Sequence, residues 1–326
     1  MMLNVSASPH IRDKSTTSQI MRDVFLSLVP ALIPAYLVFG IRAIVVCLVS
    51  VASCVGFEAL WNIMIKRPQT IKDFSAAVTG LLLAYNLPVS IPIWIVIVGS
   101  FLAIILSKQI FGGLGYNFSN PAITARVILL VSFPAQMTNF MLMAGDKLVS
   151  SATPLAQLRS GALSNPDYWN LFLGYKAGCI GEISCLFLLI GAVYLLLNGI
   201  IQVWIPLSFL GTTTLVMVLA GQDPLVHLLS GGLILGAFFM ATDYVTSPPT
   251  IPGKIIFGVG CGLLVAIMRL YSNSAEGVSY AILFMNILSP HIESWTKAVP
   301  IGQKPLREAA KAKKAAGGDL PAAANK

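Results

Sequence analysis

The sequence predicts an all-α, polytopic membrane protein of about ten transmembrane helices. Of its 326 residues, 56% are hydrophobic and only 10% are charged, whereas soluble domains carry about 25% charged residues. The mean hydropathy is +0.81. Long apolar runs favour helices over the short alternating strands of a membrane barrel. This composition excludes soluble globular, disordered, coiled-coil and small disulfide-rich proteins.

Ten apolar segments come close to the roughly 20 residues that a helix needs to cross the bilayer core. The expected spans are 24–40, 43–65, 74–91, 91–110, 119–135, 183–200, 201–220, 225–242, 254–270 and 277–290. A long polar interval separates the first five from the last five. The predicted organisation is an N-terminal arm (1–23), a first membrane repeat (24–135), a loop (136–182), a second membrane repeat (183–290) and a basic tail (291–326).

The placement of lysine and arginine predicts the orientation of these spans. Basic residues gather in the N-terminal arm, after the second span and in the C-terminal tail. Ten spans put all three regions on one side, and the positive-inside rule makes that side the cytoplasm. The 136–182 loop then lies outside. The net charge of +8 therefore indicates orientation and contact with membrane lipid, not binding to nucleic acid.

Cysteine and histidine usage indicates no metal centre. The five cysteines contain no CxxC pair and sit mostly in apolar stretches, and the three histidines are far apart. Small buried thiols are the expected interpretation.

The two halves of the chain resemble each other weakly. Residues 80–88 resemble the segment that begins at Gly232, and residues 120–125 resemble 276–281. The offsets are about 152 and 156 residues (232 minus 80, 276 minus 120), as a rough repeat period. Because five spans is an odd number, the second copy would enter from the other side. We therefore expect a five-plus-five inverted repeat with helices broken by glycine and proline, which places a site near the midplane.

One hydroxyl-rich string stands out in the 136–182 loop. It reads Ser150-Ser151-Ala152-Thr153-Pro154-Leu155. A solvated turn is the default interpretation. The threonine hydroxyl is also accessible to a modifying enzyme, although nothing beside it makes it a nucleophile of its own. No catalytic residue of the chain itself is predicted.

This string is similar to the flavinylation motif, usually Ser-Gly-Ala-Thr-Pro-Leu, of the RnfD/NqrB family of membrane electron-transfer subunits. Ser151 replaces the usual glycine. The resemblance covers nearly the whole chain, and its length fits the RnfD branch better. Further matching stretches are 111–117 with 120–122, Gly178 to Ser184 in the pattern Gly-x-x-Gly-Glu-x-Ser, 241–248, and 276–281.

The resemblance implies a cofactor. Thr153 would carry FMN through a phosphoester made by a separate flavin transferase, with Ser150, Ser151 and Ala152 beside it. FMN provides one- and two-electron chemistry that side chains lack. The family also implies a non-covalent riboflavin in some members.

The resemblance also implies a protein complex and a reaction in which the chain takes part. The chain would be a subunit of a bacterial inner-membrane complex that passes electrons between ferredoxin and NAD while moving Na⁺ or H⁺. Its partners would resemble RnfA, RnfB, RnfC, RnfE and RnfG. An NqrB-like subunit that passes electrons to quinone is one alternative, and a channel or secondary transporter for a small solute is another.

Several polar residues within or beside the spans are further candidates. Glu182 would lie in the first turn of the sixth span, where the helix dipole favours it, and a flavin contact is the second interpretation. Glu58 and Glu276 are candidates for an ion pathway, because charges inside a membrane are costly. Four more residues could line a second flavin or ion site near the midplane: Asn117, Asn120, Thr242 and Asp243.

Overall fold

The computed structural model describes residues 16–144, 147–162, 166–272 and 277–297. The first half contains α1 (Thr17–Leu28), η1 (Val29–Ala31), α2 (Leu32–Phe39), α3 (Ile41–Met64), η2 (Ile71–Asp73), α4 (Ser75–Tyr85), α5 (Ile93–Phe101), η3 (Leu102–Gln109) and α6 (Pro121–Ser132). The connecting region contains α7 (Pro134–Met137), β1 (Met141–Ala144), β2 (Lys147–Ser150), α8 (Pro154–Arg159) and α9 (Tyr168–Leu173). The second half contains α10 (Cys185–Leu197), α11 (Trp204–Leu219), α12 (Pro224–Leu229), α13 (Leu233–Leu235), η4 (Gly236–Met240), α14 (Ile251–Tyr271) and α15 (Gly277–Thr296).

The all-α prediction is confirmed. Each expected span corresponds to one helix or to two or three consecutive helical segments, and the strands of the described residues form one short antiparallel hairpin, β1–β2. Among the described residues, three helices are long and apolar enough to cross a membrane: Thr17–Phe39, Ile41–Met64 and Ile251–Tyr271. Large apolar side chains such as Leu37, Leu48 and Leu215 are exposed. An outer surface of this kind suits a lipid environment.

Local sequence explains where the first helices begin and end. The Thr16 hydroxyl accepts from the Gln19 amide, while the Gln19 side chain accepts from the Thr16 amide, which is a capping box at the start of α1. Pro30 lies in the η1 turn that joins α1 to α2. Gly40, with φ of +69°, separates α2 from α3, because a residue with positive φ cannot continue a right-handed helix.

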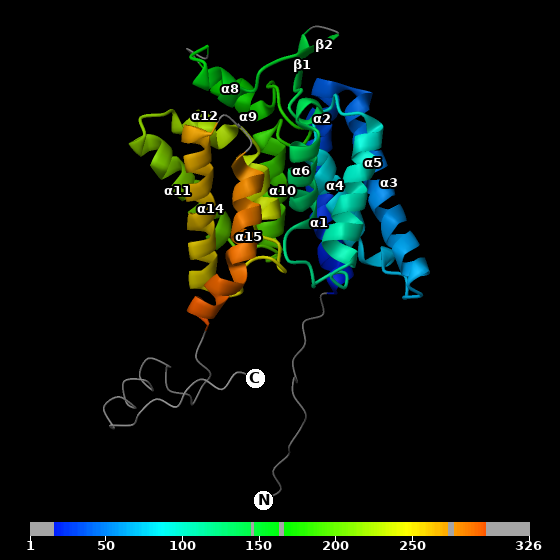
Figure 1. Ribbon diagram of the computed structural model, residues 1–326. Helices are drawn as coiled ribbons and strands as arrows, with labels where there is room; N and C mark the ends of the chain where they lie inside the picture. Colours follow the sequence, from blue (N-terminus) through cyan, green and yellow to red (C-terminus); the bar gives the residue numbers. More distant parts are fainter. Residues whose placement is uncertain (1–15, 145–146, 163–165, 273–276, 298–326) are drawn as a thin grey trace, which may run out of the picture.

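Hydrogen bonds between helix ends show which of these ends lie together at each end of the bundle. The Ser18 hydroxyl donates to the Lys72 carbonyl, so α1 starts where α3 ends. The Arg42 guanidinium at the start of α3 donates to the Val89 carbonyl, before α5. Thr250 and Thr296 bond to each other, so α14 starts where α15 ends. In Figure 1 the starts of α1 and α14 lie at the lower end, and β1, β2, α8 and α9 lie at the upper end.

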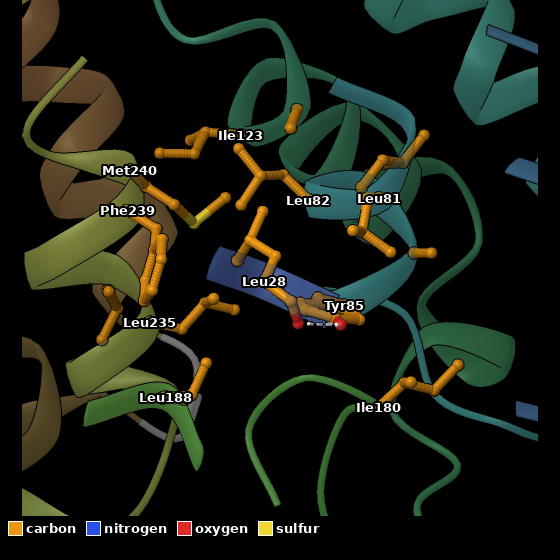
Figure 2. Close-up of a cluster of buried hydrophobic side chains, with 14 of the residues drawn as sticks. Leu28, Leu81, Leu82, Tyr85, Ile123, Ile180, Leu188, Leu235, Phe239 and Met240 are labelled. Atoms are coloured by element: carbon orange, nitrogen blue, oxygen red, sulfur yellow. Dashed lines mark hydrogen bonds between the residues drawn. The ribbon is translucent and has the colours of Figure 1, made fainter. Parts of the chain in front are cut away.

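Two half-helices meet near the middle of the bundle. The helix α4 stops at Tyr85, and its last carbonyls would lack partners in a membrane interior. The segment just before α10 provides them: the Gly181 amide donates to the Tyr85 carbonyl at 2.9 Å, and the Ile180 amide donates to the Leu87 carbonyl at 3.0 Å. The Tyr85 hydroxyl donates to the Leu28 carbonyl at 2.7 Å (Figure 2). The end of the predicted 136–182 loop is therefore buried in the core.

The second half contains the matching break. The helix α12 ends at Leu229, and Gly231 and Gly232, with φ of +68° and +65°, turn the chain into α13 and η4. The two halves also pack alike: α3 lies against α4 and α5, and α11 lies against α12 and α14. Across the halves, α1 packs on α10 and α6 packs on α15. The two halves therefore share a packing pattern.

Candidate functional site

The hydroxyl-rich string 150–155 lies at the upper end of the bundle in Figure 1. Ser150 ends β2, and its hydroxyl donates to the Asn139 side chain. The Ser151 amide donates to the Phe140 carbonyl, and the Ala152 carbonyl accepts from the Gln157 side chain. Thr153 is the N-cap of α8, and its hydroxyl oxygen accepts from the Ala156 amide at 3.3 Å. These bonds hold the string in a fixed turn.

Thr153 is partly exposed, and its surroundings suit an attached group. Its neighbours Ser150 and Ala152 are exposed, so an enzyme can approach. Beneath Thr153 lies a cavity of about 10 Å³ that Lys176 and Glu182 also line. This cavity holds about one water. Only a small part of a group bonded to Thr153 could therefore enter it.

The structure places Glu182 differently from the sequence prediction. The helix α10 begins at Cys185 with Ser184 as its N-cap, so Glu182 precedes the helix and is not in its first turn. A Cβ added at Gly232 would come within 2.7 Å of the Glu182 carboxylate. The carboxylate therefore lies at the start of the Leu233–Met240 helical segment, whose N-terminal dipole favours an anion. The helix end next to Glu182 is thus that of α13, which is distant from it in the sequence, and not that of α10.

Glu182 belongs to a buried polar cluster at the junction of the half-helices. The Arg126 guanidinium on α6 is 3.5 Å from the Glu182 carboxylate and also donates to the Asn86 side chain at the end of α4. Asn86 in turn donates to the Leu82 carbonyl. Both charged side chains are less than 8% exposed. One buried ion pair thus connects α4, α6 and the segment before α10.

The four predicted midplane residues lie together. Asn117, Asn120, Thr242 and Asp243 line one cavity of about 90 Å³ between α1, α4, α6 and η4. Asn120 caps α6 by accepting from the Ala122 amide, and it also donates to the Met240 carbonyl. The cavity is well below the roughly 300 Å³ of typical small-molecule pockets. Amide, hydroxyl and carboxylate groups therefore line a single cavity.

Asp243 lies outside the membrane-spanning helices, in the loop between η4 and α14. Burial raises the pKa of its carboxyl, and hydrogen bonds from the Val245 amide, the Thr246 hydroxyl and the Asn117 side chain oppose the rise. The charge at this end of the cavity therefore depends on pH over a higher range than for an exposed aspartate.

The same cavity reaches a buried ion pair. Lys108 lines it, and the Lys108 ammonium lies 2.9 Å from the Glu58 carboxylate and 2.6 Å from the Ser75 hydroxyl. The Thr70 hydroxyl donates to the other carboxylate oxygen of Glu58 at 2.5 Å. Glu58 is thus held by a cation and a hydroxyl next to the cavity. The second predicted ion-pathway residue, Glu276, lies outside the described residues.

Sequence reasoning missed two buried cations, the Glu58 partner Lys108 and the carbonyl-bound Arg269. Lys108 and Arg269 fall near the ends of expected spans, where a long cationic side chain commonly reaches water. In the structure they are 2% and 6% exposed. Their proximity to an expected broken helix was the one available signal, and it does not specify a partner.

Comparison with known proteins identifies the family. The profile of the NQR2, RnfD, RnfE family matches residues 4–302. The chain belongs to this family. It is 50% identical, over 95% of its length and 98% of the relative, to the D subunit of the Na(+)-translocating ferredoxin:NAD(+) oxidoreductase complex of Acetobacterium woodii.

Two other relatives of the NQR2, RnfD, RnfE family agree with this match. The D subunit of the proton-translocating ferredoxin:NAD(+) oxidoreductase complex of Clostridium ljungdahlii is 39% identical over 93% of this chain and 97% of the relative. The D subunit of an ion-translocating oxidoreductase complex of Stutzerimonas stutzeri is 40% identical over 86% of this chain and 90% of the relative. The family resemblance seen in the sequence is confirmed.

Proposed function

We propose that this chain is the D subunit of an ion-translocating ferredoxin:NAD(+) oxidoreductase complex and carries FMN on Thr153. The identity of 50% over 95% of the chain to a protein of that name supports the complex. The N-cap position of Thr153, which leaves its hydroxyl partly exposed beside a cavity, supports the attachment. Other subunits of the complex would complete the electron path, so the chain alone would not turn over.

The residues around Thr153 fit the attached group. FMN supplies one- and two-electron redox chemistry when it is bound. The turn 150–153 holds the attachment oxygen in place through bonds to Asn139, Phe140 and Gln157. A covalent tether keeps the cofactor at a high local concentration near its redox partners. The chain therefore provides attachment and position, while the cofactor provides the chemistry.

Intact-mass measurement of the natively expressed chain tests the attachment. The parent protein and Ser150→Ala should carry the added mass of FMN and show flavin fluorescence in a denaturing gel. Thr153→Ala should show neither. Absence of the added mass from the parent, or its persistence in Thr153→Ala, contradicts the proposal. An unmodified parent would leave the solute channel or transporter as the better interpretation.

The partner proteins distinguish the proposed complex from the NqrB-like alternative. Purification of the chain under mild conditions should recover subunits resembling RnfA, RnfB, RnfC, RnfE and RnfG, and the complex should reduce NAD with ferredoxin. Reduction of quinone by the same complex, with no ferredoxin dependence, would favour the alternative.

We also propose that the cavity beside the Glu58–Lys108 pair is part of the ion path, with Na⁺ or H⁺ as the cargo. Asp243 and Asn117 line the cavity and offer oxygen ligands of the kind that hard cations prefer. Asp243→Asn should reduce ion uptake into vesicles while FMN remains attached. Unchanged uptake would exclude the cavity from the path.

A further inference from the structure

Three cations surround the cavity below Thr153, against one carboxylate. Lys176 and Glu182 line this cavity directly. Arg126 contacts Glu182, and Arg269 donates to the carbonyl of Gly231, which also lines it. All four charged side chains are at most 7% exposed. Burial of unbalanced charge is costly unless a counter-ion compensates it, so this region favours an added anion.

Lys176 is the cation best placed to meet that anion. Its ammonium donates to the Leu229 carbonyl and lies 3.5 Å from the Cys185 sulfur, and both partners are neutral acceptors. The ion pairs of the described residues do not include it. The neighbouring Glu182 carboxylate is already paired with Arg126. Lys176 is therefore a buried charge with no charged partner among the described side chains.

Lys176 and Thr153 both line this cavity. Because the cavity holds about one water, the residues that line it lie close to one another. Gly178 and Gly231 form part of the lining and have no side chain, so the oxygens of an inserted group can approach their backbone. A phosphate attached to the Thr153 oxygen would have this space next to it.

We propose that Lys176 binds the phosphodiester that links FMN to Thr153, which rests on the proposed attachment. In the attachment step, the Thr153 oxygen bonds to the flavin-side phosphorus of a flavin pyrophosphate donor. The pyrophosphate P–O bond breaks, a nucleoside monophosphate leaves and the hydroxyl proton passes to solvent. The resulting diester carries one negative charge, which balances the Lys176 ammonium. Lys176 is thus a positioning residue that holds the tether against the bundle.

Three variants distinguish an effect of the charge of Lys176 from an effect of the shape of its side chain. Lys176→Gln keeps a donor for the Leu229 carbonyl but has no charge, and Lys176→Arg keeps the charge. Lys72→Met removes an exposed lysine after α3 and serves as the control. Each purified protein is examined by intact mass, thermal unfolding and ³¹P NMR of the linked phosphorus, in the folded state and after denaturation.

In the parent, Lys176→Arg and Lys72→Met, the ³¹P shift of the folded protein should differ from its denatured value. In Lys176→Gln most of that difference should disappear. Loss of FMN from Lys176→Gln alone, with a folded chain, would also support a role for the charge. An unchanged ³¹P difference in Lys176→Gln overturns the inference, as does equal loss of FMN from Lys176→Gln and Lys176→Arg.

The mass of the parent separates this inference from the proposed function. A parent without added FMN removes the attachment itself, and the assignment of Lys176 falls with it. A parent that carries FMN, with the same ³¹P shift in Lys176→Gln, retains the proposed function and removes only the role of Lys176.

Discussion

Lys108 and Glu58 form a 2.9 Å ion pair whose side chains are 2% and 1% exposed. Lys108 lies at the end of the helix that α5 and η3 form, and it contacts Ser75 at the start of the half-helix α4. Arg269 near the end of α14 contacts the end of the half-helix α12, where it donates to the backbone carbonyls of His227 and Ser230. Each half of the chain thus has a buried cation at one end of a half-helix, and in the first half that cation is paired with a carboxylate.

Glu58→Gln should destabilise the folded chain strongly. The substitution leaves the buried Lys108 ammonium with neutral partners only, the Ser75 hydroxyl and the new amide, and loss of one member of a buried pair costs about 3–5 kcal/mol. Replacement of both residues, as Glu58→Leu with Lys108→Met, should recover much of that loss. Thermal unfolding in detergent measures both effects. A double variant no more stable than Glu58→Gln would contradict the importance of the unpaired charge.

Gly181→Ala should prevent the close packing of the half-helix junction. A Cβ at Gly181 would overlap the Tyr85 Cβ, so the segment before α10 must move and its bonds to Tyr85 and Leu87 weaken. Overpacking of this kind costs about 1–3 kcal/mol, which thermal unfolding in detergent measures. Gly56→Ala on α3 is the control, because no atom lies within 4 Å of its added Cβ. It should be neutral or stabilising by up to about 1 kcal/mol.

Tyr85→Phe should destabilise the core more than an equivalent surface change. The Tyr85 side chain is fully buried, and its hydroxyl donates to the Leu28 carbonyl. Loss of the bond leaves that carbonyl with one partner fewer, at a cost of about 1 kcal/mol. Tyr271→Phe, at a residue 83% exposed, should leave the melting temperature unchanged. Equal melting temperatures for the two variants would show that the buried bond contributes nothing.

Asp243→Asn should stabilise the chain at neutral pH and lose that advantage in acid. The folded-state pKa of Asp243 is raised by burial above its ordinary 3.8. A raised pKa contributes stability that is fully present below the ordinary pKa and is lost as pH rises through the folded-state pKa. Asparagine avoids the loss, because it is always neutral. Melting temperatures of parent and variant should therefore diverge from about pH 4 upward, and parallel curves would contradict the raised pKa.

The sequence was sufficient for the helices and for the family. Apolar runs such as 43–65 predict α3 almost to the residue, because a helix in a bilayer satisfies its own backbone and needs no distant partner. Proline and glycine after Tyr85 and before Leu233 indicated the broken helices for the same local reason. The string at Thr153 and the clustering of Asn117 with Asp243 could also be predicted from the sequence. Both predictions depend on short motifs, which lie between expected membrane spans.

Tertiary structure alone decided the partners of the buried charges. Glu182 meets Arg126 and the start of α13, and Glu58 meets Lys108, across 50 residues or more of sequence. Lys176 comes to the cavity beneath Thr153 only because the segment before α10 enters the core. Such contacts depend on how helices from two repeats pack, and the periodicity of a single helix carries no information about which distant residue will face it.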